Sequence, residues 1–468
     1  MDMLTFSFDS SGEKPLYHQL YEYIKGEIRS GRIEFNTKLP SKRKLSAYLK
    51  ISQNTIQTAY DQLIEEGYIV AVSKKGFFVS PLDNILDLDL KSSVNYSESE
   101  IEAEQLVYDF SYHGVDHMSF PFTIWRRLTK DAINEYDMDL LKPGSSQGRS
   151  DLRVSIAKYL RHSRGVNCSA EQIVISSGTE SLFQILIQLL GQKYVYGIEN
   201  PGYEKLNLLF KSNNAKFKTI DIDMKGMKIE EIEKSGADIL CITPAHQFPS
   251  GGIMPITRRI KILNWAYEKV NRYIIEDDYD SEFKYSGKPI PALFGLDTYD
   301  KVIYMGSLSK SLSPSIRVSY MVLPELLLKE YWEKLSFIVC PVPTIDQKVL
   351  QRFIEDGHFE RHINRMRNIY KRKREVLVGE LVELKGQIDI LGADAGLHLL
   401  LRVNNGMSEE KLVEKAKEVG VGVYGISKYY YDKNSLDKVS TVLLGYAGMN
   451  DKNIRKAIGK LIDSWFKV

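Results

Sequence analysis

Cysteine is scarce in this chain of 468 residues, which contains only Cys168, Cys241 and Cys340. The three are far apart in the sequence, and neither a CxxC pair nor any other metal-ligand spacing occurs. This pattern argues against a disulfide framework and against a zinc-ribbon type of site. We therefore expect reduced, structural thiols, a cytoplasmic location and no metal centre.

Long apolar runs and a net charge of one sign are also lacking. No stretch of 18 apolar residues occurs, so we expect no transmembrane helix and no membrane partner. The first ten residues, MDMLTFSFDS, do not place a basic region before an apolar one, so no signal peptide is expected. The formal net charge is only +2. Any affinity for nucleic acid must therefore come from a local basic patch.

Three zones differ in their pattern along the chain. Residues 1–80 have helical periodicity and a short β end, and residues 107–468 alternate strands with helices, which predicts an α/β layer architecture. Between them, residues 81–106 carry seven acidic side chains, several serines and a single lysine. Such a segment buries little apolar surface and indicates an acidic, flexible linker. A specific docking role for its acidic face is the alternative.

The first zone predicts three helices followed by a hairpin. Apolar residues recur every four positions from Leu16 to Ile28, and Ser41 and Ser52 are suited to cap a second and a third helix. In the second helix Leu45, Tyr48 and Leu49 are expected to face inward. Gly67 is expected to end the third helix. The predicted hairpin strands are Tyr68–Val72 and Phe77–Val79.

Three helices and a basic hairpin are typical of a winged helix-turn-helix, whose third helix enters the DNA major groove through its N-terminal residues. Residues 35–60 include no acidic residue and five basic ones. A solvated basic face is the alternative interpretation. The predicted DNA-contacting residues are Lys42, Arg43, Ser52, Gln53, Asn54, Thr55, Lys74 and Lys75.

The segments Leu39–Leu45, Ile51–Ile56 and Leu63–Tyr68 resemble the GntR family of winged-helix regulators. The resemblance implies binding to a double-stranded DNA operator. Many relatives carry a basic residue directly after the serine, where this chain has Gln53. The operator sequence therefore cannot be transferred from them.

Four motifs follow one another in the large zone. Ile173–Glu180 runs from a strand into a small-residue turn that opens a helix, which suits a phosphate, and Asn200–Tyr203 offers an aromatic ring. Tyr273–Asp280 ends a buried strand in a cluster of carboxylates, at the edge where ligands bind in open α/β sheets. Tyr304–Lys310 places a lysine after an apolar strand, with Arg317 beyond it. Taken singly, a plain turn, a core aromatic and a surface lysine are the commoner interpretations.

In this order the four motifs resemble fold-type I pyridoxal-phosphate enzymes of the aspartate aminotransferase superfamily. Together with the stretch Thr243–Gly251 and the winged helix, the chain resembles MocR-type regulators, some of which sense γ-aminobutyrate (GabR) or pyridoxal phosphate (PdxR). The resemblance implies an α/β fold of the fold-type I aminotransferase-like kind with an N-terminal winged helix-turn-helix. It also implies a large cofactor-binding part at about 146–330, a small C-terminal part at about 335–468, and a homodimer.

The resemblance assigns roles by matched position. Lys310 would form the Schiff base with pyridoxal phosphate, Asp277 rather than Asp278 would hold the pyridinium nitrogen, and Tyr279 would bond the ring hydroxyl. Tyr203 would stack on the ring. His246 lies near the ring by analogy, with no assigned role. The residues expected around the phosphate are Ser177, Gly178, Thr179, Ser307 and Arg317.

One departure from the aminotransferases bears on function. They, and the γ-aminobutyrate sensor, place an arginine near the C-terminal strand for the ligand carboxylate, but residues 437–447 contain none; Lys438 offers no bidentate fork. We therefore predict a pyridoxal-phosphate-dependent transcription regulator that senses the cofactor or a small amino compound and controls genes of vitamin B6 or amino-acid metabolism. The alternatives are an active aminotransferase with an attached DNA-binding module, and a ligand-free dimerisation scaffold.

Overall fold

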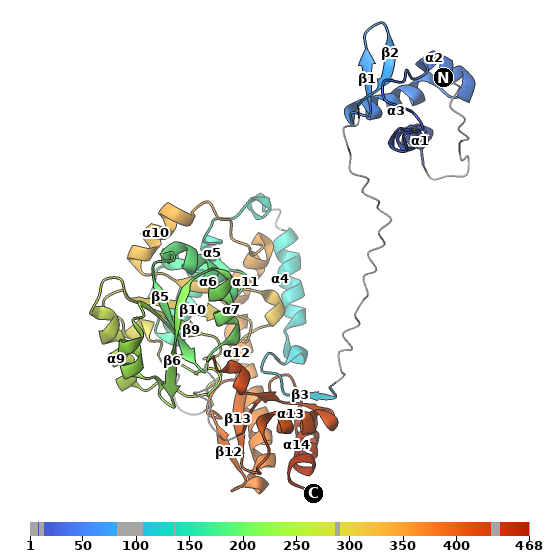
Figure 1. Ribbon diagram of the computed structural model, residues 1–468. Coiled ribbons are helices and arrows are strands. Elements are labelled where there is room, and N and C mark those ends of the chain that lie inside the picture. Colours follow the sequence, from blue (N-terminus) through green and yellow to red (C-terminus); the bar gives the residue numbers. More distant parts are fainter. Residues whose placement is uncertain are drawn as a thin grey trace. The chain divides into compact units, whose positions relative to one another are not determined.

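The computed structural model shows two compact units, residues 1–103 and residues 104–468 (Figure 1). The acidic segment predicted as a linker, residues 81–106, lies outside the described residues except at its two ends. The structure describes residues 8, 14–81, 106–134, 137–285, 291–431 and 440–467.

The first unit consists of three helices and a β-hairpin. The helices are α1 (Leu16–Arg29), α2 (Lys42–Leu49) and α3 (Gln53–Glu65). The strands β1 (Ile69–Val72) and β2 (Gly76–Val79) pair antiparallel, with Ile69 opposite Val79. This arrangement confirms the predicted winged helix-turn-helix.

The helix ends follow from capping side chains. The hydroxyl of Ser41 accepts a hydrogen bond from the backbone N–H of Lys44 at 3.3 Å, and that of Ser52 accepts one from Thr55 at 3.1 Å. At the other end of α3, Gly67 has a φ of +78°, which allows the next backbone N–H to return to the Leu63 carbonyl at 2.9 Å.

The core of this unit confirms the periodicity with one exception. Leu20, Ile24 and Ile28 of α1 pack against α3 and Leu45 of α2. Tyr48, predicted to face inward, is 43% exposed, so that prediction is wrong. Leu49, also predicted to face inward, is partly buried against this core, so the short helix α2 contacts the core through Leu45 and Leu49.

The second unit is built on an eight-stranded sheet with the order β4-β11-β10-β9-β8-β5-β6-β7. The strands β10, β9, β8, β5 and β6 are parallel to one another, whereas β11 is antiparallel to β10 and β4, and β7 is antiparallel to β6. The strands are β4 (Ile173–Ser176), β5 (Val195–Asn200), β6 (Lys216–Asp223), β7 (Gly226–Met227), β8 (Ile239–Ile242), β9 (Tyr273–Asp278), β10 (Val302–Ser307) and β11 (Ser319–Val322).

Helices cover both faces of this sheet (Figure 1). Along β9, Tyr273 and Ile275 pack into the cluster that holds α6, α7 and α10, whereas Ile274 packs into the cluster of α8 and α9. Burial on both faces explains why these strands are continuously apolar. The helices are α4 (Phe122–Asn134), α5 (Ser150–Arg164), α6 (Thr179–Leu190), α7 (Glu204–Ser212), α8 (Ile229–Ser235), α9 (Ile256–Tyr267), α10 (Glu325–Leu335) and α11 (Thr344–Glu355).

A smaller C-terminal part follows the long helix α12 (His358–Leu381). Its antiparallel sheet has the order β12-β13-β16-β15, and the short strand β3 (Tyr108–Asp109) pairs with β14, so the start of this unit is tied to its C-terminal part. No described helix is long and apolar enough to cross a membrane. The elements are β12 (Ile388–Leu391), β13 (His398–Val403), α13 (Glu409–Glu418), β14 (Val421–Gly422), β15 (Tyr424–Gly425), β16 (Thr441–Gly445) and α14 (Asp451–Phe466).

Candidate functional site

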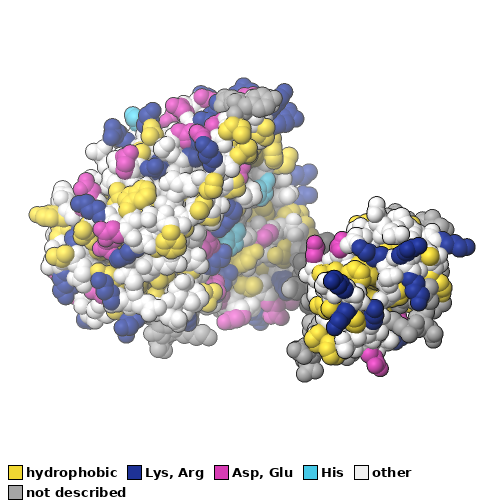
Figure 2. Space-filling view, turned by 90° about the horizontal axis from the view of Figure 1, so that it is seen from above, with side chains coloured by type: hydrophobic (Ala, Val, Ile, Leu, Met, Phe, Trp, Pro, Cys, Tyr) yellow, Lys and Arg dark blue, Asp and Glu magenta, His cyan; other side chains and the backbone are white. Residues whose placement is uncertain are grey.

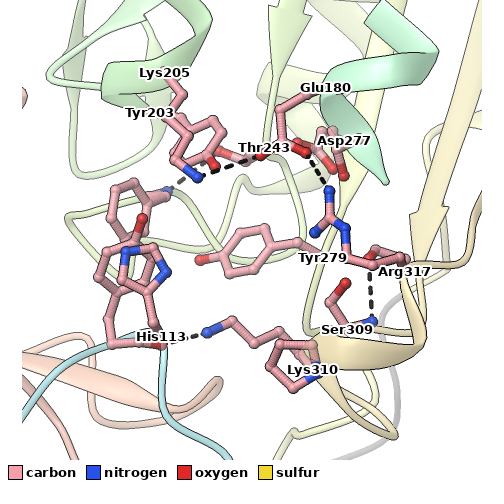
Figure 3. A pocket seen from close by; sticks show the side chains of 15 residues that line it. His113, Glu180, Tyr203, Lys205, Thr243, Asp277, Tyr279, Ser309, Lys310 and Arg317 are labelled. Carbon is pink, nitrogen blue, oxygen red and sulfur yellow. Dashed lines mark hydrogen bonds and ion pairs between the residues drawn. The ribbon is translucent and has the colours of Figure 1, made fainter. Parts of the chain in front are cut away.

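A pocket opens where the central strands of the large sheet end (Figure 3). Its cavity volume is about 170 Å³. Seven of the residues predicted to hold the cofactor line it: Thr179, Tyr203, Asp277, Tyr279, Ser307, Lys310 and Arg317. The structure therefore brings together residues from four separate sequence motifs.

Ser177 and Gly178, also predicted to surround the phosphate, do not line the pocket themselves but lie next to Arg317, which does. The Arg317 guanidinium donates a hydrogen bond to the Ser177 carbonyl at 3.3 Å. A Cβ at position 178 would lie 2.2 Å from an Arg317 nitrogen, and the backbone there has a φ of +101°. Only glycine fits both conditions, so Gly178 lets Arg317 approach the N-terminus of α6.

Sequence reasoning missed part of the lining. Tyr112 and His113 come from the segment after β3, which carries no motif and reaches the pocket only because β3 pairs with β14. Thr243 and Phe248 belong to the stretch Thr243–Gly251, which supports the resemblance as a whole but predicts no role for either residue. The other unpredicted lining residues are Glu180, Lys205, Ser309 and Pro314.

Lys310 presents a recessed amine in this pocket. Its Nζ donates a hydrogen bond to the Tyr112 carbonyl and lies 5.1 Å from the centroid of the Tyr112 ring. Burial lowers the pKa of Lys310 to about 8, against a smaller opposing effect of Asp280. At pH 7 roughly a tenth of such amines are uncharged, which makes Lys310 a usable nucleophile.

Asp277 and Asp278 are neighbours on β9 and therefore point to opposite faces of the sheet. The Asp278 carboxylate accepts hydrogen bonds from Arg164 and Tyr304, both at 2.7 Å. Asp277 faces the pocket, and no hydrogen bond to its carboxylate exists within the described part of the chain. Burial, helped by Asp278, raises the pKa of Asp277 to about 7. A buried carboxylate in this state calls for a positively charged or proton-donating partner.

Aromatic rings form the walls between the amine and the carboxylate. The Phe248 ring centroid lies 6.2 Å from the centroids of both Tyr203 and Tyr279, in edge-to-face geometry. The Tyr279 hydroxyl lies 3.0 Å from Nδ1 of His246. Figure 3 shows Tyr279 and Lys310 reaching into the same space. A flat ligand between these rings would find a hydroxyl and an amine at its edge.

An anion site lies at the other end of the pocket, at the first turn of α6. The helix N-terminus offers backbone N–H groups and a positive dipole end, and Arg317 adds a charge. In this structure Glu180 takes up that charge, with its carboxylate 3.1 Å from Arg317 and 3.4 Å from Lys205. Burial raises the pKa of Glu180, but its own backbone N–H and Arg317 outweigh burial and leave the pKa lowered. An incoming anion therefore competes with Glu180 for Arg317.

The stretch near the C-terminal strand that lacks an arginine is apolar in the structure. Every residue of β16 is buried, and Leu443 packs with Phe248, Leu400 and Tyr429 beside the pocket. Lys438, weighed as a substitute for the missing arginine, lies outside the described residues. The described residues packed around Leu443 are apolar, so a carboxylate directed at them would lose water without gaining a charged partner.

The predicted DNA-contacting residues share the surface of the first unit. Ser52, Gln53 and Asn54 at the start of α3 are exposed, as are Arg43 and the hairpin lysines Lys74 and Lys75. Figure 2 shows Lys and Arg side chains gathered on the visible face of this unit.

Three of these residues are partly engaged elsewhere. Lys42 is half-buried and donates a hydrogen bond to Gln57. The hydroxyls of Ser52 and Thr55 are bonded to each other at 2.9 Å as part of the cap of α3. The other five, Arg43, Gln53, Asn54, Lys74 and Lys75, are exposed and therefore freer to reach DNA.

The fold and the pocket place the second unit in the class of fold-type I aminotransferase-like proteins. In this chain a winged helix-turn-helix precedes that unit in the sequence. Residues 115–461 match the family Aminotransferase class I and II, and residues 16–79 match Bacterial regulatory proteins, gntR family. The kynurenine aminotransferase of Pyrococcus horikoshii superposes with a TM-score of 0.69 at 25% identity, covering 78% of this chain and 91% of the other.

Similar proteins also share the fusion of the two domains. The chain is 42% identical to the uncharacterized HTH-type transcriptional regulator YdeL of Bacillus subtilis, over 96% of this chain and 97% of the other. Identity is 30% to the probable rhizopine catabolism regulatory protein MocR of Rhizobium meliloti (97% and 94% covered) and 27% to the pyridoxine biosynthesis transcriptional regulator PdxR of Corynebacterium glutamicum (95% of each). The chain belongs to this family of HTH-type transcriptional regulators, in which a GntR domain is fused to an aminotransferase class I and II domain.

Proposed function

We propose that this chain is a DNA-binding regulator whose aminotransferase-like unit binds pyridoxal phosphate and transmits its occupancy to the winged helix. One observation carries the proposal. A single pocket combines the recessed amine of Lys310, the unbonded carboxylate of Asp277 and an arginine at a helix N-terminus. These are the groups that an aldehyde, a pyridinium nitrogen and a phosphate require.

The residues present fit this cofactor. Arg317, Thr179 and the first backbone N–H groups of α6 would hold the phosphate. Asp277 would accept a hydrogen bond from the protonated ring nitrogen, which would give its buried charge a partner. Tyr203 would lie against the ring, and Tyr279 would donate its hydroxyl hydrogen bond to the ring oxygen.

Pyridoxal phosphate supplies an aldehyde that condenses with primary amines, and a protonated ring that withdraws electrons. Lys310 contributes the amine, which its lowered pKa keeps partly uncharged. Asp277 would keep the proton on the ring nitrogen. The rings of Tyr203, Phe248 and Tyr279, which pack in one cluster, would help to exclude water from the reacting end.

Pyridoxal phosphate itself is the first effector we propose, and a small amino compound is the second. The described residues packed around Leu443 of β16 include no charged partner for the carboxylate of an α-amino acid. The names of the relatives MocR and PdxR refer to rhizopine catabolism and to pyridoxine biosynthesis, respectively. We therefore infer that the target genes serve vitamin B6 or amino-acid metabolism.

An active aminotransferase is the second candidate function. The similarity to solved aminotransferases and the presence of Lys310 and Asp277 favour it. Against it stands the missing carboxylate partner, because misplacing a substrate by about 1 Å can reduce turnover by about 100-fold. A transamination assay over a panel of amino acids separates the two candidates: multiple turnovers support the enzyme, and spectral binding without turnover supports the sensor.

Replacing Glu180 by glutamine is expected to tighten binding of pyridoxal phosphate. The glutamine keeps the shape of the side chain but no longer neutralises Arg317, so the phosphate meets one negative charge fewer. We expect a dissociation constant about 3- to 10-fold lower in an absorbance titration, roughly one charge interaction in a half-exposed site. Glu204→Gln, on the neighbouring helix α7, serves as the control. Unchanged or weaker binding in Glu180→Gln would contradict the competition.

We also propose that the protein is a homodimer held by the aminotransferase-like unit. Residues 118–141 expose five large apolar side chains, each more than half accessible, which is unusual for a surface that stays in water. Sedimentation at micromolar concentration is expected to give the mass of two chains, and a single-chain mass would refute this assignment. The five side chains are Met118, Phe122, Ile133, Met138 and Leu141.

The proposed function is tested by two measurements on the purified full chain. Addition of pyridoxal phosphate is expected to produce a saturable change in the cofactor absorbance, with one equivalent per chain. Selection from a library of DNA duplexes is expected to enrich a defined operator. A chain that selects no sequence, or that does not bind the cofactor, would overturn the proposal.

A further inference from the structure

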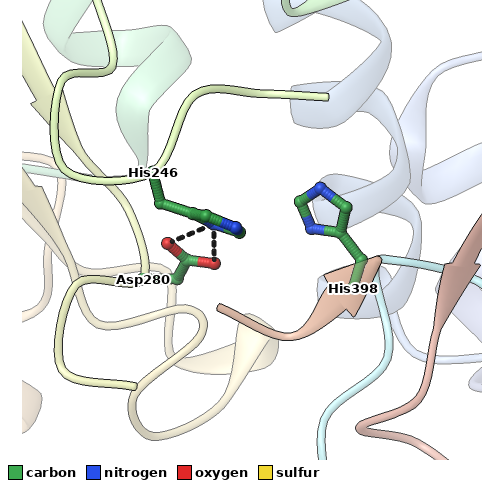
Figure 4. Close-up of side chains that lie close together, drawn as sticks. All are labelled: His246, Asp280 and His398. Atoms are coloured by element: carbon green, nitrogen blue, oxygen red, sulfur yellow. Dashed lines mark hydrogen bonds and ion pairs between the residues drawn. The ribbon is translucent and has the colours of Figure 1, made fainter. Parts of the chain in front are cut away.

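Three potential metal ligands, His246, Asp280 and His398, lie close together (Figure 4), and one of them, His246, contacts the pocket residue Tyr279. His246 follows β8, Asp280 follows β9, and His398 begins β13, so the set joins the large part of this unit to its C-terminal part. Each residue is only 2% exposed. One ligand atom from each lies within 4.8 Å of the other two.

The two imidazoles have lone pairs that the described residues leave unused. Nε2 of His398 lies 3.1 Å from the Pro249 carbonyl; a carbonyl only accepts, so this nitrogen carries the hydrogen and Nδ1 carries the lone pair. Nδ1 of His246 lies 3.0–3.1 Å from both Asp280 carboxylate oxygens. Nε2 of His246 is buried and has no hydrogen-bond partner in the described structure.

The negative charge of this cluster is only partly balanced. The buried Asp280 carboxylate has one ionic partner among the described residues, the His246 ring, and no lysine or arginine lies within ion-pair distance of it. A buried carboxylate and two imidazoles with free lone pairs are electron-rich groups that lack a cation. Gly396, with a φ of +73°, makes room for two of these side chains, because a Cβ there would lie 2.0 Å from His246 and 2.6 Å from Asp280.

We propose that His246, Asp280 and His398 form a binding site for a divalent transition-metal ion, zinc above all. Two imidazoles and one carboxylate suit Zn²⁺ and its neighbours, whereas Mg²⁺ and Ca²⁺ require oxygen ligands. With metal–ligand bonds of about 2.0–2.2 Å, tetrahedral ligand atoms lie roughly 3.3–3.5 Å apart. The ligand atoms lie within 4.8 Å of one another, so they close by about 1.5 Å at most as the ion binds, and Asp280 exchanges its hydrogen bond to Nδ1 of His246 for the ion. Water completes the coordination.

Such an ion would act on the cofactor pocket and on the fold together. Tyr279, which lines the pocket, has its hydroxyl 3.0 Å from Nδ1 of His246, so a change at His246 reaches the group that faces the cofactor. His398 belongs to the C-terminal sheet, so the ion would fasten that sheet to the loops after β8 and β9. Sequence analysis predicts no metal centre, and it misses this set because the three residues come from three distant segments.

The test uses the untagged full chain, stripped with a chelator and then titrated with Zn²⁺ alone by calorimetry. We expect one equivalent per chain, a higher melting temperature with Zn²⁺, and visible d–d absorption when Co²⁺ replaces Zn²⁺. Loss of a second-sphere partner alone costs metal sites about 10- to 100-fold in affinity, so His398→Gln is expected to weaken Zn²⁺ binding at least that much. The control is His162→Gln, an exposed histidine of α5.

Two further readouts keep the test decisive. Circular dichroism checks that His398→Gln is folded, and Asp280→Asn provides a second variant with nearly the same shape. In both, the rise in melting temperature with Zn²⁺ should disappear, while His162→Gln keeps it. Failure to bind one equivalent of Zn²⁺, or wild-type affinity in His398→Gln and Asp280→Asn, would overturn the site. Because metal binding is measured without cofactor, either result leaves the proposed function to be judged separately.

Discussion

Replacing Lys310 by alanine is expected to abolish covalent attachment of pyridoxal phosphate. Lysine at its ordinary pKa of 10.5 is almost fully charged at pH 7, and lowering the pKa to about 8 raises the uncharged fraction roughly 300-fold. Lys310 also lines the same pocket as Asp277 and Tyr279. Borohydride reduction followed by peptide mass spectrometry should find the cofactor on the peptide of Lys310 in the wild type and on none in Lys310→Ala.

Lys205 provides the matched control, because it is the other lysine in the pocket lining. Its amine lies 3.4 Å from the Glu180 carboxylate, at the phosphate end. Lys205→Ala should therefore keep the reducible attachment at Lys310. A wild-type-like cofactor spectrum in Lys310→Ala, or stoichiometric attachment at Lys205, would remove the basis for the assignment of Lys310.

The second large effect is expected at the start of α3. Gln53 and Asn54 are exposed at the helix end that a winged helix-turn-helix directs into the major groove, and their amides can bond base edges in pairs. Gln53→Ala and Asn54→Ala should each weaken binding to the selected operator by about 1–3 kcal/mol and relax the base preference. Binding to unrelated DNA should hardly change. Fluorescence anisotropy with operator and scrambled duplexes measures both.

Arg43 tests the phosphate contacts of the same surface. It is exposed, whereas Lys42 is bonded to Gln57, so Arg43→Ala is expected to weaken binding to all duplexes alike and to lower the salt slope by about one. Gln62→Ala, near the opposite end of α3, is the control and should bind like the wild type. Operator affinities that are unaffected in Gln53→Ala, Asn54→Ala and Arg43→Ala would exclude α3 as the recognition helix.

Local signals in the sequence predicted the winged helix well. The caps of α2 and α3 depend on Ser41 and Ser52, which bond backbone groups three residues away, and Gly67 ends α3 by its own conformation. Such features act within a few residues and can be read in order. The prediction for Tyr48 was wrong because Leu45 and Leu49, four residues apart, form the face of α2 that meets the core, and Tyr48 lies beside that face.

The pocket was predictable where its residues sit in ordered motifs and unpredictable where distant segments meet. Asp277 and Asp278 are adjacent in the sequence, and the structure separates them by the alternation of β9, with Asp278 bonded to Arg164. Tyr112 reaches the pocket only through the pairing of β3 with β14. The ion pair between Glu180 and Arg317 is likewise a tertiary contact. Its two residues come from separate motifs, so the sequence does not show that they meet.

The central claim is that cofactor occupancy at Lys310 controls DNA binding. The most direct measurement is the affinity of wild type and Lys310→Ala for the same operator, each without and with saturating pyridoxal phosphate. A regulator with a coupling free energy of about 1–3 kcal/mol should change its operator affinity about 5- to 150-fold in the wild type. In Lys310→Ala the change should be much smaller. Equal operator affinity with and without cofactor in the wild type would contradict the account.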